Sequence, residues 1–133
     1  MFRKFTTKRA GFTLVEIMIV VAIIALLAAI AVPGFLRARK RSQASKILND
    51  LRMISGAVDQ YAIENSKKSD DVVEVEDWTK YIKKDTNLYN TGQDLFGNSF
   101  GSQTVDIVPK VPQASYDALS DVTDNTFWSP YNP

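Results

Sequence analysis

The chain has 133 residues, and its 16 Lys and Arg side chains against 15 Asp and Glu leave a net charge of +1. This length holds at most one small domain beside any membrane segment. Cysteine and histidine are both absent, which excludes disulfides, thiolate or imidazole metal sites and the usual catalytic triads, so we do not expect an enzyme.

Residues 1–11 form a short basic segment, and an apolar stretch follows it. From Ile17 to Leu36 there are twenty residues without a charged or strongly polar side chain, and a membrane-spanning helix needs about 20. A cleaved secretory signal is the alternative, because Ala28, Ala29 and Ala31 resemble its small-residue cleavage site, but such signals have a shorter apolar region. The sequence therefore predicts a spanning helix over residues 12–36.

Basic residues lie close to this stretch on both sides, so the positive-inside rule gives no orientation. Arg3, Lys4, Lys8 and Arg9 precede the stretch, and Arg37, Arg39, Lys40 and Arg41 follow it.

Glu16 places one carboxylate near the start of the apolar stretch. A carboxylate in lipid costs several kcal/mol unless it is neutralised, hydrogen-bonded or paired with a cation. The nearest cations are Arg9 and Lys8, and an alternative is that Glu16 lies shallowly among the lipid headgroups. The residue types alone leave the partner of Glu16 open.

Pro33 and Gly34 follow the centre of the apolar stretch. Proline lacks an N–H and its ring collides with the preceding turn, so we expect a helix kink at Pro33-Gly34, unless the pair only marks the membrane exit.

Residues 37–65 have the pattern of an amphipathic helix ending near Asn65. Its apolar positions follow a period of 3.5 residues and need a partner surface, while the charged residues between them suit a solvated face. The apolar positions are Ala44, Ile47, Leu51, Ile54, Val58 and Tyr61, and the charged ones are Lys46, Asp50, Arg52, Asp59 and Glu64.

Residues 66–133 have the composition of a small, turn-rich globular domain, and the fold class expected for the whole chain is α+β. A long N-terminal helix, half membrane-spanning and half amphipathic, packs on this domain with its short strands. After Val72 we expect either a short strand or an extended lead to a brief helix, and then a helix over 78–84 capped by Asp77. Turns at 90–92 and 97–98, a strand over 103–108 and a helical turn capped by Ser115 are expected to follow.

The stretch KRAGFTLVEIMIVVAIIALLAAIAVPGF resembles the amino-terminal signature of type IV prepilins and of the pseudopilins of type II secretion. The matching features are the basic leader that ends in Gly11, the aromatic Phe12, Glu16 five residues after the leader, and Pro33. The resemblance implies cleavage after Gly11 and N-methylation of Phe12. It also implies that the freed amine of Phe12, in the same subunit or a neighbour, pairs with Glu16 during assembly.

The resemblance further implies a structural subunit that forms a homopolymer through its N-terminal helix. The expected partners are a prepilin peptidase, an inner-membrane assembly platform and minor pilins or pseudopilins, and nucleic acid is not among them. The subunit would cross the bacterial inner membrane once, with its C-terminal domain outside the cytoplasm, before entering a surface pilus or a periplasmic pseudopilus. A single-pass anchored domain that binds another envelope protein is the alternative.

The segment DLFGNSFG, residues 94–101, is similar to a segment of major pseudopilins, with Leu95 and Ser99 where that family has prolines. In those proteins a nearby loop binds calcium, and the candidate ligands here are Asp94, Asp121 and Asp124. Because the spacing is not that of an EF-hand and no glycines shape a cage, turn and capping roles are expected instead, with no cofactor.

Opposite charges are segregated along the chain. Residues 37–52 hold six basic side chains and one Asp, whereas residues 85–133 hold six Asp and one Lys. We expect acidic domain surfaces to face the basic helix of neighbouring copies, the alternative being that both are solvated faces.

Overall fold

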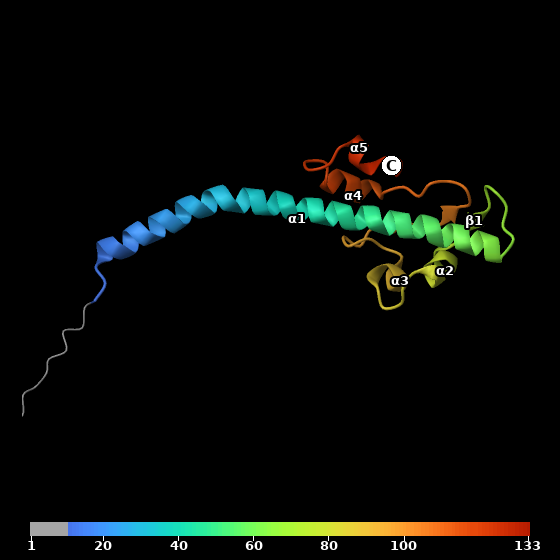
Figure 1. The fold of residues 1–133 in the computed structure, drawn as a ribbon, viewed down its shortest axis with the longest axis horizontal. Coiled ribbons are helices and arrows are strands. Elements are labelled where there is room, and N and C mark those ends of the chain that lie inside the picture. Colours follow the sequence, from blue (N-terminus) through green and yellow to red (C-terminus); the bar gives the residue numbers. More distant parts are fainter. Residues whose placement is uncertain (1–10) are drawn as a thin grey trace, which may run out of the picture. The chain divides into compact units, whose positions relative to one another are not determined.

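The computed structural model describes residues 11–133, which divide into two compact units at Leu36. The fold class expected from the sequence is confirmed, with one long helix followed by a region of short strands, short helices and turns (Figure 1). The elements are α1 (Leu14–Glu64), β1 (Val72–Val73), α2 (Val75–Trp78), η1 (Thr79–Tyr81), α3 (Asn87–Thr91), β2 (Gln103–Thr104), α4 (Gln113–Ala118) and α5 (Asn125–Trp128).

The first unit consists, in its described part, of Gly11 to Leu36, and most of it is the first half of α1. Its apolar side chains are exposed, and α1 is the only helix within residues 11–133 that is long and apolar enough to cross a membrane. The helix continues through Pro33, which leaves the carbonyl of Ala29 without its usual donor. The kink at Pro33-Gly34 stays a prediction, and the basic leader of residues 1–10 lies outside the described residues.

The second unit, Arg37–Pro133, is built around the second half of α1. Five of the six apolar positions expected to face a partner surface are buried, and Tyr61 is half-buried. The prediction that Asp50 lies on a solvated face was wrong, because this side chain is only 4% exposed. It shares the buried face of α1 with Ile47 and Ile54, one turn away in either direction, and with the adjacent Leu51.

The shorter elements surround this half of α1. In the view of Figure 1, α2 and α3 lie on one side of it and α4 and α5 on the other. The only strands in the described chain are β1 and β2, which pair antiparallel with Val72 opposite Thr104 and Val73 opposite Gln103. Trp78 and Trp128 are fully buried and bring large apolar side chains to the core from α2 and α5.

Three local predictions for this unit need correction. The helix expected over 78–84 begins at Val75, so Asp77 lies inside it and does not cap it. The strand expected over 103–108 ends at Thr104, because Asp106 adopts a left-handed conformation with φ of 64° that takes the chain out of the sheet. Ser115 lies inside α4, and its buried hydroxyl bonds a distant carboxylate instead of capping the helix.

Gly92 ends α3 in a left-handed conformation, with φ of 63°. A Cβ at this position would lie 2.6 Å from Cγ1 of Val75, so the turn needs both the conformational freedom and the small size of glycine. The turn expected at 90–92 is instead the end of α3, which contains Asn90 and Thr91, and Gly92 is where α3 approaches α2.

Every buried side chain of the described residues lies between Ala44 and Trp128, and thus within the second unit. Residues 11–43 contribute none of this core. We therefore expect residues 37–133 to fold as an isolated soluble fragment, because removing the first unit exposes no core side chain.

Candidate processing and assembly site

Gly11 and Phe12 precede the first turn of α1, outside the helix. The Phe12 side chain is 87% exposed, and a Cβ placed on Gly11 would meet no atom within 4 Å. No packing contact in the described structure therefore requires glycine at position 11.

Thr13 and Glu16 form a reciprocal pair of hydrogen bonds at the start of α1. The backbone N–H of Thr13 donates to Glu16 Oε2 at 3.3 Å, and the backbone N–H of Glu16 donates to Thr13 Oγ1 at 3.2 Å. This is a capping box, which satisfies two N–H groups that a helix start leaves without partners. Sequence reasoning counted Thr13 only among the residues of the matching signature and missed its capping role, although the pattern of Thr followed three residues later by Glu before an apolar run predicts such a box.

Replacing Thr13 by alanine should loosen the first turn of α1. Losing a Thr cap costs about 1 kcal/mol, so amide hydrogen exchange at residues 15–17 of the full chain in micelles should be about fivefold faster. Thr13→Ser keeps the hydroxyl and should exchange like the parent. Unchanged exchange in Thr13→Ala would show that the box does not hold this turn.

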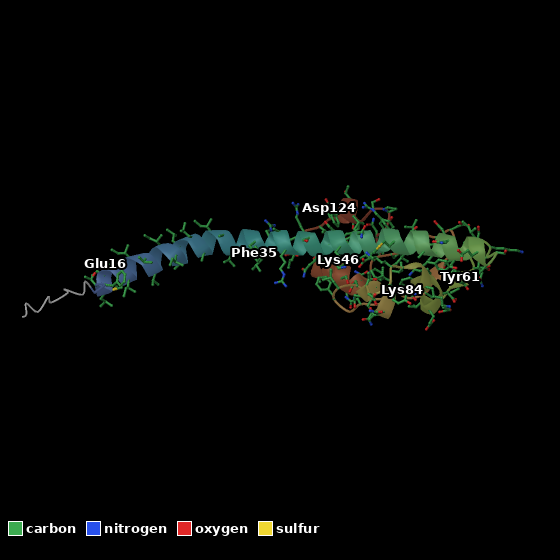
Figure 2. The ribbon with its side chains drawn as sticks, turned by 60° about the horizontal axis from the view of Figure 1, so that its bottom comes forward. Glu16, Phe35, Lys46, Tyr61, Lys84 and Asp124 are labelled. Carbon is green, nitrogen blue, oxygen red and sulfur yellow. The ribbon has the colours of Figure 1, made fainter. Side chains whose placement is uncertain are left out.

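Glu16 has apolar surroundings apart from this box. Figure 2 labels it at the amino-terminal end of α1, where it lines a hollow with Phe12, Ile17, Val20 and Val21. Within residues 11–133 no basic side chain lies within salt-bridge distance of its carboxylate. The box satisfies one carboxylate oxygen with a peptide N–H but supplies no positive charge.

The nitrogen of Phe12 lies one residue before the N–H that already bonds Glu16. Consecutive Cα atoms are about 3.8 Å apart, so only a small rearrangement separates this nitrogen from the Glu16 carboxylate. In the uncleaved chain it is a neutral peptide nitrogen, whereas a free amino terminus is an ammonium group at neutral pH. The geometry thus allows Glu16 to gain a cation once the bond after Gly11 is cut.

The three calcium candidates have separate roles in the second unit. Asp94 is 1% exposed and fully engaged in hydrogen bonds, Asp121 pairs with Lys40 at 2.8 Å, and Asp124 caps α5 by accepting from the N–H of Phe127 at 2.8 Å. The hydrogen bond from Lys40 lowers the pKa of Asp121 below its ordinary value. Within the part of the chain that the structure describes, no group of three acidic side chains is placed to hold a metal.

The expectation that the chain binds no calcium therefore stays a prediction. Titrating calcium into the fragment 37–133 should give no heat and no shift in melting temperature, because Lys40 already neutralises Asp121. A saturable heat that disappears in Asp121→Asn would contradict this expectation and assign Asp121 as a ligand.

The Lys40–Asp121 pair also limits the expectation that acidic domain surfaces face the basic helix of neighbouring copies. It joins the basic segment of α1 to the acidic C-terminal segment of the same chain, with both side chains about half exposed. Part of the charge complementarity is therefore satisfied within one subunit, and only the remaining basic residues are available to neighbours.

Asp50 is a buried acid close to a second one. Burial raises its pKa, Lys46 opposes the increase and Asp94 adds to it. A folded-state pKa above the unfolded value means that the folded chain binds more protons between the two values, so stability falls as pH rises through that window. Asp50→Asn should therefore raise the melting temperature of fragment 37–133 at pH 7, with the gain vanishing below pH 4; a lower melting temperature at pH 7 would contradict this account.

Comparison with known proteins identifies the amino-terminal features. Residues 6–32 match the family model described as the prokaryotic N-terminal methylation motif. The chain is 37% identical over 60 residues to type II secretion system core protein G of Klebsiella pneumoniae, covering 45% of this chain and 43% of the relative. No solved structure matches the chain.

Two pilins are similar to the chain over a comparable length. It is 42% identical over 67 residues to the type IV major pilin protein PilA of Myxococcus xanthus (strain DK1622), covering 50% of this chain and 30% of the relative. It is 39% identical over 70 residues to the type IV major fimbrial protein FimA of Dichelobacter nodosus, covering 53% and 42%. The chain spans less than half the length of these relatives, and within that length it is similar both to type IV pilins and to a type II secretion core protein.

Proposed function

We propose that this protein is a structural subunit of a type IV pilus-like filament or of a type II secretion pseudopilus. A prepilin peptidase cuts it after Gly11, Phe12 becomes an N-methylated amino terminus, and the subunits polymerise through their N-terminal helices. The protein has no catalytic role of its own in this proposal. The family resemblance and the names of the relatives support both filament types equally.

The observation that carries the proposal is an exposed apolar helix with a single carboxylate at its start. Apolar side chains from Leu14 to Leu36 are at least half exposed, and Glu16 has no basic partner among the described residues. Such a surface is stable only in lipid or among other apolar helices. Both environments make the lone carboxylate costly, and therefore make a newly formed amine at Phe12 a valuable partner.

Small side chains on the same helix favour close packing of copies. Moving a subunit from lipid into a helical bundle removes little apolar surface from water, so association depends on tight contact between backbones. Alanine side chains allow such close backbone contact at five positions of the apolar half of α1: Ala22, Ala25, Ala28, Ala29 and Ala31.

Before assembly the subunit lies in the bacterial inner membrane as a single-pass protein, with residues 37–133 outside the cytoplasm. An inner-membrane assembly platform extracts it, and minor pilins or pseudopilins join the polymer. The methylation motif and the apolar helix support the membrane location, whereas the orientation rests on the family resemblance.

A non-polymerising membrane anchor is the second candidate. The self-contained core of residues 37–133 favours it, because an anchored domain would need the first unit only as a tether. The two candidates differ in what they require of the amino terminus: an anchor works with its leader attached, whereas a filament subunit needs the freed amine.

Immunogold electron microscopy tests the choice. An antibody raised against fragment 37–133 is applied to cells that express the full chain, and sheared material and membranes are compared by immunoblotting. We expect labelled filaments and a processed chain of 122 residues, from 133 − 11. Label confined to membranes, with an unprocessed chain, would support the anchor and overturn the filament.

A further inference from the structure

An acidic hollow lies where the segment between β2 and α4 passes α1 (Figure 1). Its volume is about 230 Å³, and its lining includes Val58 and Asp59 of α1 and Asp106, Ile107 and Val108 of the segment. Sites for small molecules measure about 300–1,000 Å³. This hollow is smaller and suits one protein side chain.

The lining of the acidic hollow combines two carboxylates with exposed apolar surface. Asp59 and Asp106 are both exposed, and within residues 11–133 no basic side chain lies within salt-bridge distance of either. The hydroxyl of Ser69 donates to Asp106 Oδ2, which orients this carboxylate. Ile107 and Val108 are 52% and 42% exposed beside it.

Arginine is the side chain that fits this combination. Its guanidinium group binds carboxylates through a planar set of N–H donors, and its long stem packs on apolar surface. The nearest basic residue along the segment, Lys110, lines a separate hollow that shares Ile107, Val108 and Pro109 with the acidic one. The acidic hollow is therefore open to a basic side chain from elsewhere.

Within the described residues, Arg39 is the member of the cluster Arg37, Arg39, Lys40 and Arg41 for which the structure gives no acidic neighbour in its own chain. Lys40 pairs with Asp121, and Arg37 contributes to the same site by its positive charge. Arg41 lines a different hollow together with Asp121 and Asp124. Arg39 has no acidic side chain within salt-bridge distance in the described chain.

Arg39 cannot reach the acidic hollow of its own chain. The hollow is centred near Val58 on α1, about 19 residues further along the helix, which corresponds to roughly 28 Å at 1.5 Å per residue. An arginine side chain is far shorter than this distance. The two complementary surfaces can therefore meet only between copies.

We propose that the acidic hollow is an assembly contact that receives Arg39 of a second copy of this chain. The two copies lie with their α1 helices displaced by roughly 28 Å along the helix axis. Arg39 binds Asp59 and Asp106, and its stem covers Val108. This proposal rests on the proposed function, because the contact forms in the filament. The contact sets the axial register between neighbouring subunits.

Charge reversal tests the contact in the full chain expressed with its assembly machinery. Arg39→Asp and Asp59→Arg should each lower filament yield by about tenfold, since they place like charges opposite each other, and the double variant should recover to within about twofold of the parent. Both positions are exposed on α1, so the substitutions leave the core intact. Lys84→Asp, an exposed reversal distant from both surfaces in sequence and labelled in Figure 2, should assemble like the parent.

Cysteine cross-linking tests the register directly, because the chain has no cysteine of its own. Ala38→Cys with Val108→Cys should give a ladder of disulfide-linked multimers in sheared filaments, since a disulfide needs Cα atoms within about 7 Å. The matched pair Ala38→Cys with Lys84→Cys should give none. Filaments that show no ladder and no loss in Arg39→Asp overturn the contact alone, whereas a parent chain that forms no filaments overturns the proposed function as well.

Discussion

Glu16→Gln should abolish filament assembly while leaving cleavage after Gly11 and membrane insertion intact. Opposite unit charges at 4 Å attract by about 4 kcal/mol at an effective dielectric constant of 20, and 1.4 kcal/mol corresponds to a factor of ten. Losing the attraction between Glu16 and the Phe12 amine therefore weakens each such contact by roughly a thousandfold. Filament yield is measured by immunoblotting of sheared material, and processing by the mass of the membrane-bound chain.

The capping box makes glutamine an informative substitution. Glutamine accepts the N–H of Thr13 as glutamate does, so Glu16→Gln removes the charge and keeps the helix start. Thr13→Ala does the opposite, since it removes half of the box and keeps the charge. If assembly fails in Thr13→Ala and persists in Glu16→Gln, the first turn of α1 matters and the charge does not.

Asp94→Ala should destabilise the second unit more than any surface substitution. One oxygen of this carboxylate, Oδ1, accepts the backbone N–H groups of Phe96 and Asn98, both at 2.9 Å, and Oδ2 accepts the hydroxyl of Ser115. The side chain thereby holds residues 94–98 in their turn and ties that turn to α4. It is the most buried of the acidic residues in the described chain.

The Asp94→Ala substitution leaves three donors, the two backbone N–H groups and the Ser115 hydroxyl, without their acceptor in a buried site. Each unsatisfied donor costs about 1–3 kcal/mol, so we expect a loss of about 3–5 kcal/mol in the free energy of unfolding, a large part of the 5–15 kcal/mol typical of a domain. Urea denaturation of fragment 37–133 measures the loss. Asp94→Asn keeps the acceptor for the two N–H groups and should lose less; equal losses in both variants would assign the stability to the charge rather than to the acceptor geometry.

The sequence predicted the long helix well because its signals are long and periodic. Twenty uncharged residues and a regular apolar seam fix the two halves of α1, and the helix ends at Glu64, one residue from the expected position. The lone Glu16 was visible because it breaks the local pattern of residue types, whereas the roles expected of Gly11 and Phe12 came from the family resemblance.

The structure of residues 66–133 was less predictable because distant contacts decide it. Ser115 looked like a helix cap, but a carboxylate 21 residues earlier in the chain accepts its hydroxyl. Asp50 looked solvated because charged residues usually are, yet it is buried, and Asp94 of a distant segment is close enough to help raise its pKa. No local pattern reports which acid another segment will bury, whereas Thr13 did have a local signal, the capping-box spacing to Glu16.

The acidic hollow illustrates the same limit. Asp59 and Asp106 are 47 residues apart in the sequence and belong to two unrelated local patterns. Only the passage of the segment after β2 along α1 places them at one hollow. Sequence reasoning found the segregation of charge, and the structure adds that Lys40 is paired with Asp121, whereas Arg39 has no acid within salt-bridge distance among the described residues.

The central claim is that cutting the chain after Gly11 creates the amine that Glu16 needs, so that maturation enables assembly. Electron microscopy of cells expressing a Gly11→Val variant tests it most directly, because no packing contact opposes a side chain at this position and the rest of the subunit is unaltered. The account predicts an intact, membrane-bound precursor and no filaments. Filaments at the parental level, built from subunits that retain their leader, would contradict it.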